Sequence, residues 1–332
     1  MRRTSFLFFH LHSHTSTFCC DPFFLSFVAS PPPSLSYFAV TYGIDEETGI
    51  KTKLEESPIP DDFVVLDVLG EWTKTWEAAK RDHRRNRLVY KVRYYITPDP
   101  RDVKAYDLMF LQLVEDVTTG NKVFGICRQL SEAAITRLAA IQMHVRVLRE
   151  QEQLTLTNEP ADVETYIRAT LEKSLHRYMP PFTFEASAAQ HATIVESVIA
   201  EWSKLVMDDD ILMAHMEYIS YAKEEAPDWF GTASFQVKNY NPTFPENIEL
   251  CVNPEFVFIV CPDTQEILRQ WSYADIPAAN ASDNVITFHI NSGSMQLKVE
   301  LNTFNNVTVE PEPEKASAIA RMIQVYKYGE LA

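Results

Sequence analysis

The chain has 332 residues, of which 46% are hydrophobic, and it carries a formal net charge of −16. This length predicts two or three domains with substantial cores. The acidic balance argues against general nucleic-acid binding, which needs a surplus of Lys and Arg. The five cysteines form no CxxC pairs, and no apolar run reaches the roughly 20 residues of a membrane span, so we expect a soluble, cytoplasmic protein with reduced thiols.

Residues 1–36 differ in composition from the rest of the chain, because Phe, Leu, Ser and Pro dominate them. These residues share pyrimidine-rich codons, so one interpretation is translated intron or untranslated sequence. A second is a secretory signal, although histidines interrupt its apolar core. A third is a metal site, whose candidate ligands are His10, His12, His14, Cys19 and Cys20. We predict a disordered or spurious segment, and we base no function on it.

The next block, residues 37–99, predicts a small sheet. Segments 37–43 and 50–54 alternate like two short strands around a turn at 45–49. Segment 88–96 alternates in period two, as a half-buried strand does.

A basic stretch at residues 80–87 is the most concentrated positive charge in the chain. One interpretation is a solvated loop. The other is a contact with an anionic surface, where each Lys or Arg near an anionic leaflet contributes about 1 kcal/mol. The candidate residues of this anionic-surface patch are Lys80, Arg81, Arg84, Arg85 and Arg87.

Residues 100–228 show helical periodicity. Segments 103–117 and 132–148 predict two amphipathic helices, the second with Ser131 as its N-cap. We expect a third helix capped by Asp162 and a fourth from Ala188, on whose apolar face His191 should be a hydrogen-bonded core histidine.

A fifth helix should follow Asp208–Asp210, since carboxylates are favoured at a helix N-terminus. Its predicted apolar positions are Leu212, Met216 and Ile219.

After Phe230 the period of the hydrophobic pattern changes to two. Six short antiparallel strands are predicted by the runs TASFQVKN, NIELCV, EFVFIVC, EILRQWSY, NVITFHI and MQLKVELNTF. A last amphipathic helix follows residues 310–314 and presents Ile319, Met322 and Ile323 on its apolar side. Strands closed by one helix are typical of a small sandwich plugged at one end.

These segments together resemble a FERM domain. The run LMFLQLVEDVTTG at 108–120, followed by RLAAIQMHV at 137–145, is similar to the start of the helical second lobe. The Trp271 strand and the helix at 318–326 resemble the third lobe, and Asp67–Trp72 resembles part of the first.

The resemblance implies an α+β multi-lobe fold. It comprises a partial ubiquitin-like β-grasp first lobe at 37–99, an all-α, acyl-CoA-binding-protein-like central bundle at 100–228, and a PH-like β-sandwich with a C-terminal helix at 229–332. A complete first lobe would begin with a hairpin and a helix before residue 37, so we expect this lobe to be truncated.

The junction APDWFGTASFQV at 226–237 is similar to the one found in the tails of unconventional myosins. This resemblance implies a non-catalytic adaptor module that binds cargo or partners and is associated with the cytoskeleton. Any motor activity would belong to sequence outside this chain. Two alternatives are an ezrin- or talin-type membrane–cytoskeleton linker that binds phosphoinositides, and the regulatory FERM region of a kinase or phosphatase.

Sequence motifs of catalysis are missing: there is no GxGxxG or GxxxxGK[ST] phosphate cradle, no HExxH and no GxSxG. We therefore expect no enzyme activity, no cofactor and no metal.

The FERM resemblance implies instead that the third lobe holds a peptide, between an edge at residues 272–279 and the C-terminal helix. The candidate groove residues are Ser272, Tyr273, Ala274, Ile276, Ala278, Lys315 and Arg321. The expected partners are cytoplasmic tails or peptides of other proteins, the cytoskeleton through a parent motor and, as a further candidate, an anionic membrane surface, but no nucleic acid.

Overall fold

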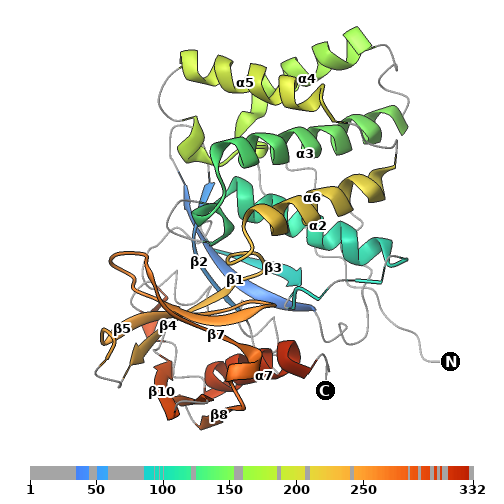
Figure 1. Ribbon diagram of the computed structural model, residues 1–332. Helices are drawn as coiled ribbons and strands as arrows, with labels where there is room; N and C mark the ends of the chain where they lie inside the picture. Colours follow the sequence, from blue (N-terminus) through green and yellow to red (C-terminus); the bar gives the residue numbers. More distant parts are fainter. Residues whose placement is uncertain are drawn as a thin grey trace, which may run out of the picture. The chain divides into compact units, whose positions relative to one another are not determined.

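Figure 1 shows the computed structural model. It describes the three strands of a first sheet and thirteen further segments, all within the compact unit Pro33–Ala332. The thirteen segments are 94–96, 98–99, 101–120, 125–152, 160–184, 188–205, 210–239, 243–282, 285–290, 293–299, 303–304, 307–308 and 313–328. The predictions for residues 1–34, including the candidate metal ligands, lie outside the described residues.

The first sheet confirms the three strands predicted between residues 37 and 96. Its antiparallel strands lie in the order β2-β1-β3 and are β1 (Leu35–Ile44), β2 (Lys51–Pro58) and β3 (Asn86–Val92). Tyr37 is paired with Tyr90, and Val40 with Glu56. Strand β1 begins at Leu35, two residues before the predicted start of this block.

A helical bundle follows. Its elements are α2 (Val103–Thr118), the short 3₁₀ helix η3 (Gly125–Arg128), α3 (Glu132–Glu152), α4 (Pro160–Ser174), α5 (Ala188–Trp202) and α6 (Ile211–Glu225). Two predicted caps are confirmed: Ser131 Oγ accepts the amide of Ala134 at 3.1 Å, and Asp210 accepts that of Leu212 at 2.8 Å. The cap predicted at Asp162 is wrong, because α4 begins at Pro160 and Asp162 lies inside the first turn.

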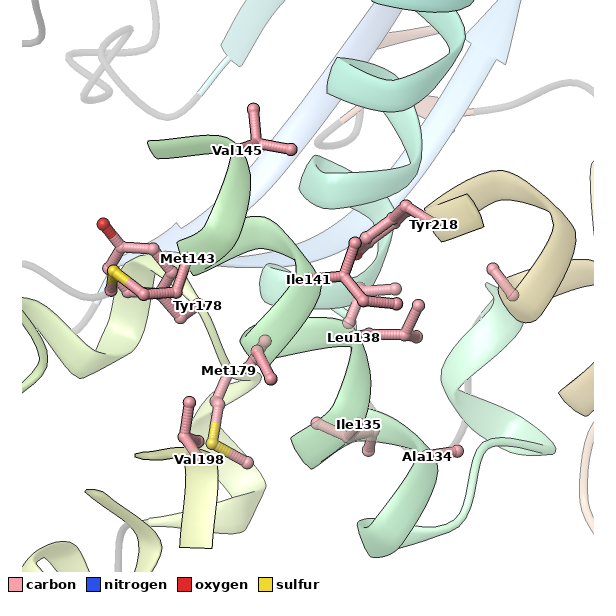
Figure 2. Packing of buried hydrophobic residues seen from close by; sticks show 14 of the residues in the cluster. Ala134, Ile135, Leu138, Ile141, Met143, Val145, Tyr178, Met179, Val198 and Tyr218 are labelled. Atoms are coloured by element: carbon pink, nitrogen blue, oxygen red, sulfur yellow. The ribbon is translucent and has the colours of Figure 1, made fainter. Parts of the chain in front are cut away.

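Helix α3 is the centre of the bundle. The four consecutive residues 138–141 are each 0% exposed, and consecutive helical positions point about 100° apart, so this part of α3 is enclosed on all sides. Figure 2 shows Ile141 beside Tyr218 of α6, with Met179 and Val198 gathered elsewhere around the same helix. The sequence predicted one apolar face for α3, whereas α4, α5 and α6 all pack against this helix.

Helix α6 buries a different face from the one predicted. Its buried residues are Ala214, His215, Tyr218 and Ala222, whereas the predicted positions Leu212, Met216 and Ile219 are only half-buried. His215 stacks on Phe110 of α2 with ring centroids 4.1 Å apart, and its Nδ1 lies 2.8 Å from Asp107 Oδ1. The fully buried histidine of the bundle is therefore His215, and His191 is half-buried.

The region after Thr232 forms a seven-stranded antiparallel sheet in the order β7-β6-β5-β4-β10-β9-β8. Its strands are β4 (Ala233–Asn239), β5 (Asn247–Val252), β6 (Phe256–Val260), β7 (Ile267–Ser272), β8 (Ala278–Ser282), β9 (Val285–Ile290) and β10 (Gly293–Val299). The sequence predicted the other six strands and missed β8. The end of the run MQLKVELNTF contributes instead to a small hairpin of β11 (Thr303–Phe304) and β12 (Val307–Thr308).

Helix α7 (Pro313–Tyr328) packs on β5, β8, β9 and β10 (Figure 1). The predicted apolar residues Ile319, Met322 and Ile323 are buried in the core of the sheet, which confirms the closing helix. Among the described residues, no helix is both long and apolar enough to cross a bilayer.

Candidate functional site

Strand β8 forms one edge of the seven-stranded sheet, and among the described strands it pairs with β9 alone. Its sequence, Ala-Ala-Asn-Ala-Ser, contains no charged residue, no proline and no bulky side chain. Edge strands in natural proteins are usually protected by such residues or by a bulge. Within the described part of the chain, the outer edge of β8 therefore has no strand partner and is open to pairing with another extended chain.

Helix α7 lies beside this edge. Ala279 of β8 is buried in the same core cluster as Ile319 and Ile323 of the helix. The next inward-facing position, Ala281, is half-buried against that cluster. β8 and α7 are therefore adjacent, and the candidate groove is defined as the edge of β8 together with the neighbouring side of α7.

The C-terminal end of α7 is fastened to the residues just before β8. Lys327 Nζ donates to the carbonyl oxygen of Ile276 at 2.6 Å and to that of Pro277 at 2.8 Å. The same ammonium group lies 5.2 Å from the ring of Tyr328, which is 61% exposed. Because these two carbonyl groups are already occupied, the open part of the edge begins at Ala278.

Residues 273–276 do not form the strand edge that the sequence predicted. Ser272 ends β7, and Tyr273–Asp275 form the 3₁₀ helix η6, which is closed by a bond from Ser272 Oγ to Asp275 Oδ2 at 2.7 Å. Ala274 is exposed on this turn. Ile276 is 1% exposed and belongs to the core, so it supports the groove from beneath and is not available to a ligand.

Tyr273 is held at the junction of two elements. Its hydroxyl group donates to the carbonyl oxygen of Asn253, and its ring centroid lies 6.1 Å from that of Tyr326 on α7. Burial is the main reason that the pKa of the Tyr273 hydroxyl is raised far above the ordinary tyrosine value. This phenol therefore stays neutral and acts as a hydrogen-bond donor.

Two of the candidate groove residues lie on α7. Arg321 is exposed, and Lys315 lies in the first turn, where its side chain is outside the described residues. The sequence missed Asn280, Ala281 and Ser282 of β8. A run of small residues after Pro277 and before the Asp283-Asn284 turn signal was the available indication of an edge strand.

The structure describes only one residue of the anionic-surface patch. Lys80, Arg81, Arg84 and Arg85 lie outside the described residues. Arg87 lies in β3, where its backbone is opposite Val40. The patch therefore stays a prediction.

Among the residues that the structure describes, no group of three or more His, Cys, Asp or Glu side chains could hold a metal ion. The described cysteines, Cys127, Cys251 and Cys261, are buried and form no disulfide.

No protein-family model matches the sequence, and no curated protein matches it. The arrangement of a small sheet, a helical bundle and a seven-stranded sheet with a closing helix is the fold of FERM domains, as comparison with solved structures shows.

The chain is similar to the MyTH4-FERM MF2 domain of Dictyostelium discoideum myosin VII, with a TM-score of 0.54 and 14% identity over 90% of this chain and 52% of that one. It is also similar to the FERM and C-terminal domain complex of Drosophila Merlin, with a TM-score of 0.53 and 14% identity over 89% and 85% of the two chains. The chain thus spans about half the length of the myosin VII structure. The predicted resemblance to FERM domains, those of myosin tails included, is confirmed at the level of the fold.

Proposed function

We propose that this chain is a non-catalytic FERM adaptor that binds an extended segment of a partner protein between β8 and α7. In this proposal residues 37–99, 100–228 and 229–332 are the three lobes. The open, uncharged edge of β8 is the observation that carries the proposal. A peptide added to such an edge gains backbone hydrogen bonds, while side-chain pockets give specificity.

The small residues of β8 support this function in a second way. Ala279 and Ala281 face the core side, and Asn280 and Ser282 are exposed on the other side. A strand with short side chains lets a second backbone approach along its whole length. The exposed residues of α7, Arg321 among them, then face the side chains of the bound peptide.

A place in the tail of an unconventional myosin is the context that we favour for this adaptor. The similarity to the myosin VII MyTH4-FERM structure and the junction APDWFGTASFQV support it. In that setting the groove would take a cytoplasmic segment of a cargo protein, and the parent motor would supply the link to the cytoskeleton.

A peptide-display screen with the full chain tests the groove. The diagnostic variant is Ala281→Arg, which places a long charged side chain in the space between β8 and α7. Gln270→Arg is the matched control, because Gln270 is exposed on β7, the opposite edge of the same sheet. Circular dichroism should show both variants folded.

We expect the screen to enrich extended peptides whose affinity falls at least about tenfold, or 1.4 kcal/mol, in A281R and stays unchanged in Q270R. The proposal fails if no peptide is enriched, or if A281R binds the enriched peptides as the unmodified chain does. Vesicles containing phosphoinositide form a second arm. Salt-sensitive vesicle binding that is lost on neutralising Arg81, Arg84, Arg85 and Arg87, without peptide binding, would favour the membrane linker instead.

A further inference from the structure

A buried asparagine connects the groove with the segment that joins the helical bundle to the seven-stranded sheet. Asn253, in the turn between β5 and β6, is fully buried. Its side-chain Oδ1 accepts the amides of Glu255 at 2.9 Å and Phe256 at 2.7 Å, and its Nδ2 donates to the carbonyl oxygen of Asp228 at 2.7 Å. Its own carbonyl oxygen accepts the hydroxyl group of Tyr273. Asn253 therefore bonds both to η6 and to the joining segment.

Asp228 continues the connection into the helical bundle. Its amide donates to Gln129 Oε1 at 3.1 Å, and Gln129 Nε2 donates back to Asp228 Oδ2 at 3.0 Å. Gln129 directly follows η3. A continuous path of hydrogen bonds thus runs from Gln129 through Asp228 and Asn253 to Tyr273, just before β8.

The other wall of the groove is tied to the same joining segment. Tyr326 of α7 accepts the backbone amide of Tyr95 on its hydroxyl oxygen at 3.0 Å. The ring of Tyr95 packs edge-on against Phe230 at 5.3 Å, and its hydroxyl group donates to Asp116 of α2 at 3.3 Å. Gly231 leaves the space for this ring, because a Cβ at that position would lie 2.5 Å from Tyr95 Cγ.

A buried ion pair holds the bundle against the sheet near this segment. Arg128 Nη2 donates to Glu249 Oε2 on β5 at 2.9 Å, and also to Gln265 Oε1 in the turn between β6 and β7. The Arg128 guanidinium lies 4.0 Å from the ring centroid of Trp229. Gln265 adopts a φ of 61°, a left-handed conformation that a residue other than glycine rarely adopts and that the surrounding contacts must hold.

We infer that the groove is energetically coupled to this junction through Asn253 and Tyr326. The two elements beside the groove are both linked to the helical bundle: η6 through Asn253 and Asp228 to Gln129, and the end of α7 through Tyr95 to Asp116. When the junction loosens, η6 and α7 become more mobile, and a peptide must then order them as it binds. Loosening therefore weakens peptide binding, and a bound peptide in turn strengthens the junction, because such coupling is reciprocal. A partner that displaces Gln129 from Asp228 would act as a negative regulator of the groove. This regulatory role rests on the peptide-binding function proposed above, whereas the physical coupling itself does not.

Amide hydrogen exchange of the full chain without any ligand tests the coupling. The first variant is Gln129→Ala, which removes both hydrogen bonds to Asp228. Gln129 is exposed and lies at the end of the hydrogen-bond path that is farthest from the groove. The reciprocal variant is Tyr273→Phe, which keeps the ring and removes only the hydroxyl donor. The control is Arg168→Gln, which breaks an ion pair with Glu164 inside α4 and one with Glu196 of α5.

We expect Q129A to speed exchange about threefold to tenfold at residues 273–278 and in the last turn of α7, as the loss of one or two net hydrogen bonds predicts. Y273F should speed exchange at residues 228–232 to a similar degree. R168Q should change neither region, and α4 and α5 should exchange unchanged in Q129A, which separates coupling from a general loss of stability. The inference is overturned if each variant alters exchange only beside the substituted residue, or alters it everywhere. If hydrogen exchange shows the coupling but the peptide screen finds no binding, the groove function is refuted and the description of the junction still holds.

Discussion

Replacing Arg128 by methionine tests the junction most directly. The side chains of Arg128 and Glu249 are only 7% and 5% exposed, and their nearest atoms lie 2.9 Å apart. Methionine keeps an unbranched apolar side chain at this position but removes the guanidinium, which lies over the ring of Trp229. Glu249 is then left as a buried carboxylate without its cation, and Gln265 loses the donor to its side-chain oxygen.

The expected loss of stability is large. Removing one partner of a buried ion pair costs about 3–5 kcal/mol, because the remaining charge is uncompensated in a poorly solvated site. Arg128→Met should therefore lower the free energy of unfolding by this amount, measured by urea denaturation with tryptophan fluorescence, which includes the signal of Trp229. The double variant R128M/E249L should recover most of the loss, since apolar replacements of a buried pair are often neutral or stabilising by about 1–4 kcal/mol.

The exposed pair of Arg168 with Glu196 provides the control, because solvent screens it. Arg168→Gln should leave the urea midpoint where it is. The reasoning is refuted if R128M is as stable as the unmodified chain, or if the double variant is as unstable as R128M. Either result would mean that Glu249 is solvated and that the bundle is not held to the sheet by this pair.

Two further predictions concern glycine and tyrosine positions. Gly231→Ala should destabilise the chain by clearly more than Gly125→Ala. Both residues have positive φ, which costs about 1–2 kcal/mol for alanine, but only at Gly231 would the added Cβ meet the ring of Tyr95. Equal losses of stability in thermal or urea unfolding would contradict that contact. Burial raises the pKa of the Tyr218 hydroxyl far above its ordinary value, so this group contributes stability that is complete below about pH 10 and declines at higher pH, where only the unfolded chain ionises readily. An alkaline titration followed by circular dichroism should show Tyr218→Phe losing less stability above about pH 10 than the unmodified chain does, and parallel losses in the two proteins would show that the hydroxyl is solvated.

Local sequence signals predicted the helix starts of α3 and α6 correctly. Ser131 and Asp210 cap their helices because the bonds they make reach only two or three residues along the chain. Asp162 carries the same signal, but α4 begins two residues earlier, at Pro160. Proline is favoured in the first turn of a helix and competes with the carboxylate for the start.

The buried face of α6 could not be predicted in the same way. Its sequence offers apolar residues on more than one side, and the side containing His215 has the lower apparent hydrophobicity. Stacking on Phe110 and the approach to Asp107 make the burial of His215 acceptable, and both residues come from α2, about a hundred positions earlier. Strand β8 was missed for a related reason, since its small residues have little strand propensity and its pairing with β9 defines it.

The sequence by itself determined the order and type of most segments and the FERM-like organisation, because amphipathic periods, caps and turns depend on near neighbours. Only the tertiary structure decided which surfaces are covered. Glu249 is a charged residue of β5 and is nevertheless buried, because Arg128 of the helical bundle pairs with it. Tyr95 and Tyr326, 231 positions apart, meet beside the candidate groove for the same reason. Burial and pairing depend on residues that the fold brings together from far apart in the chain, and no local pattern contains that information.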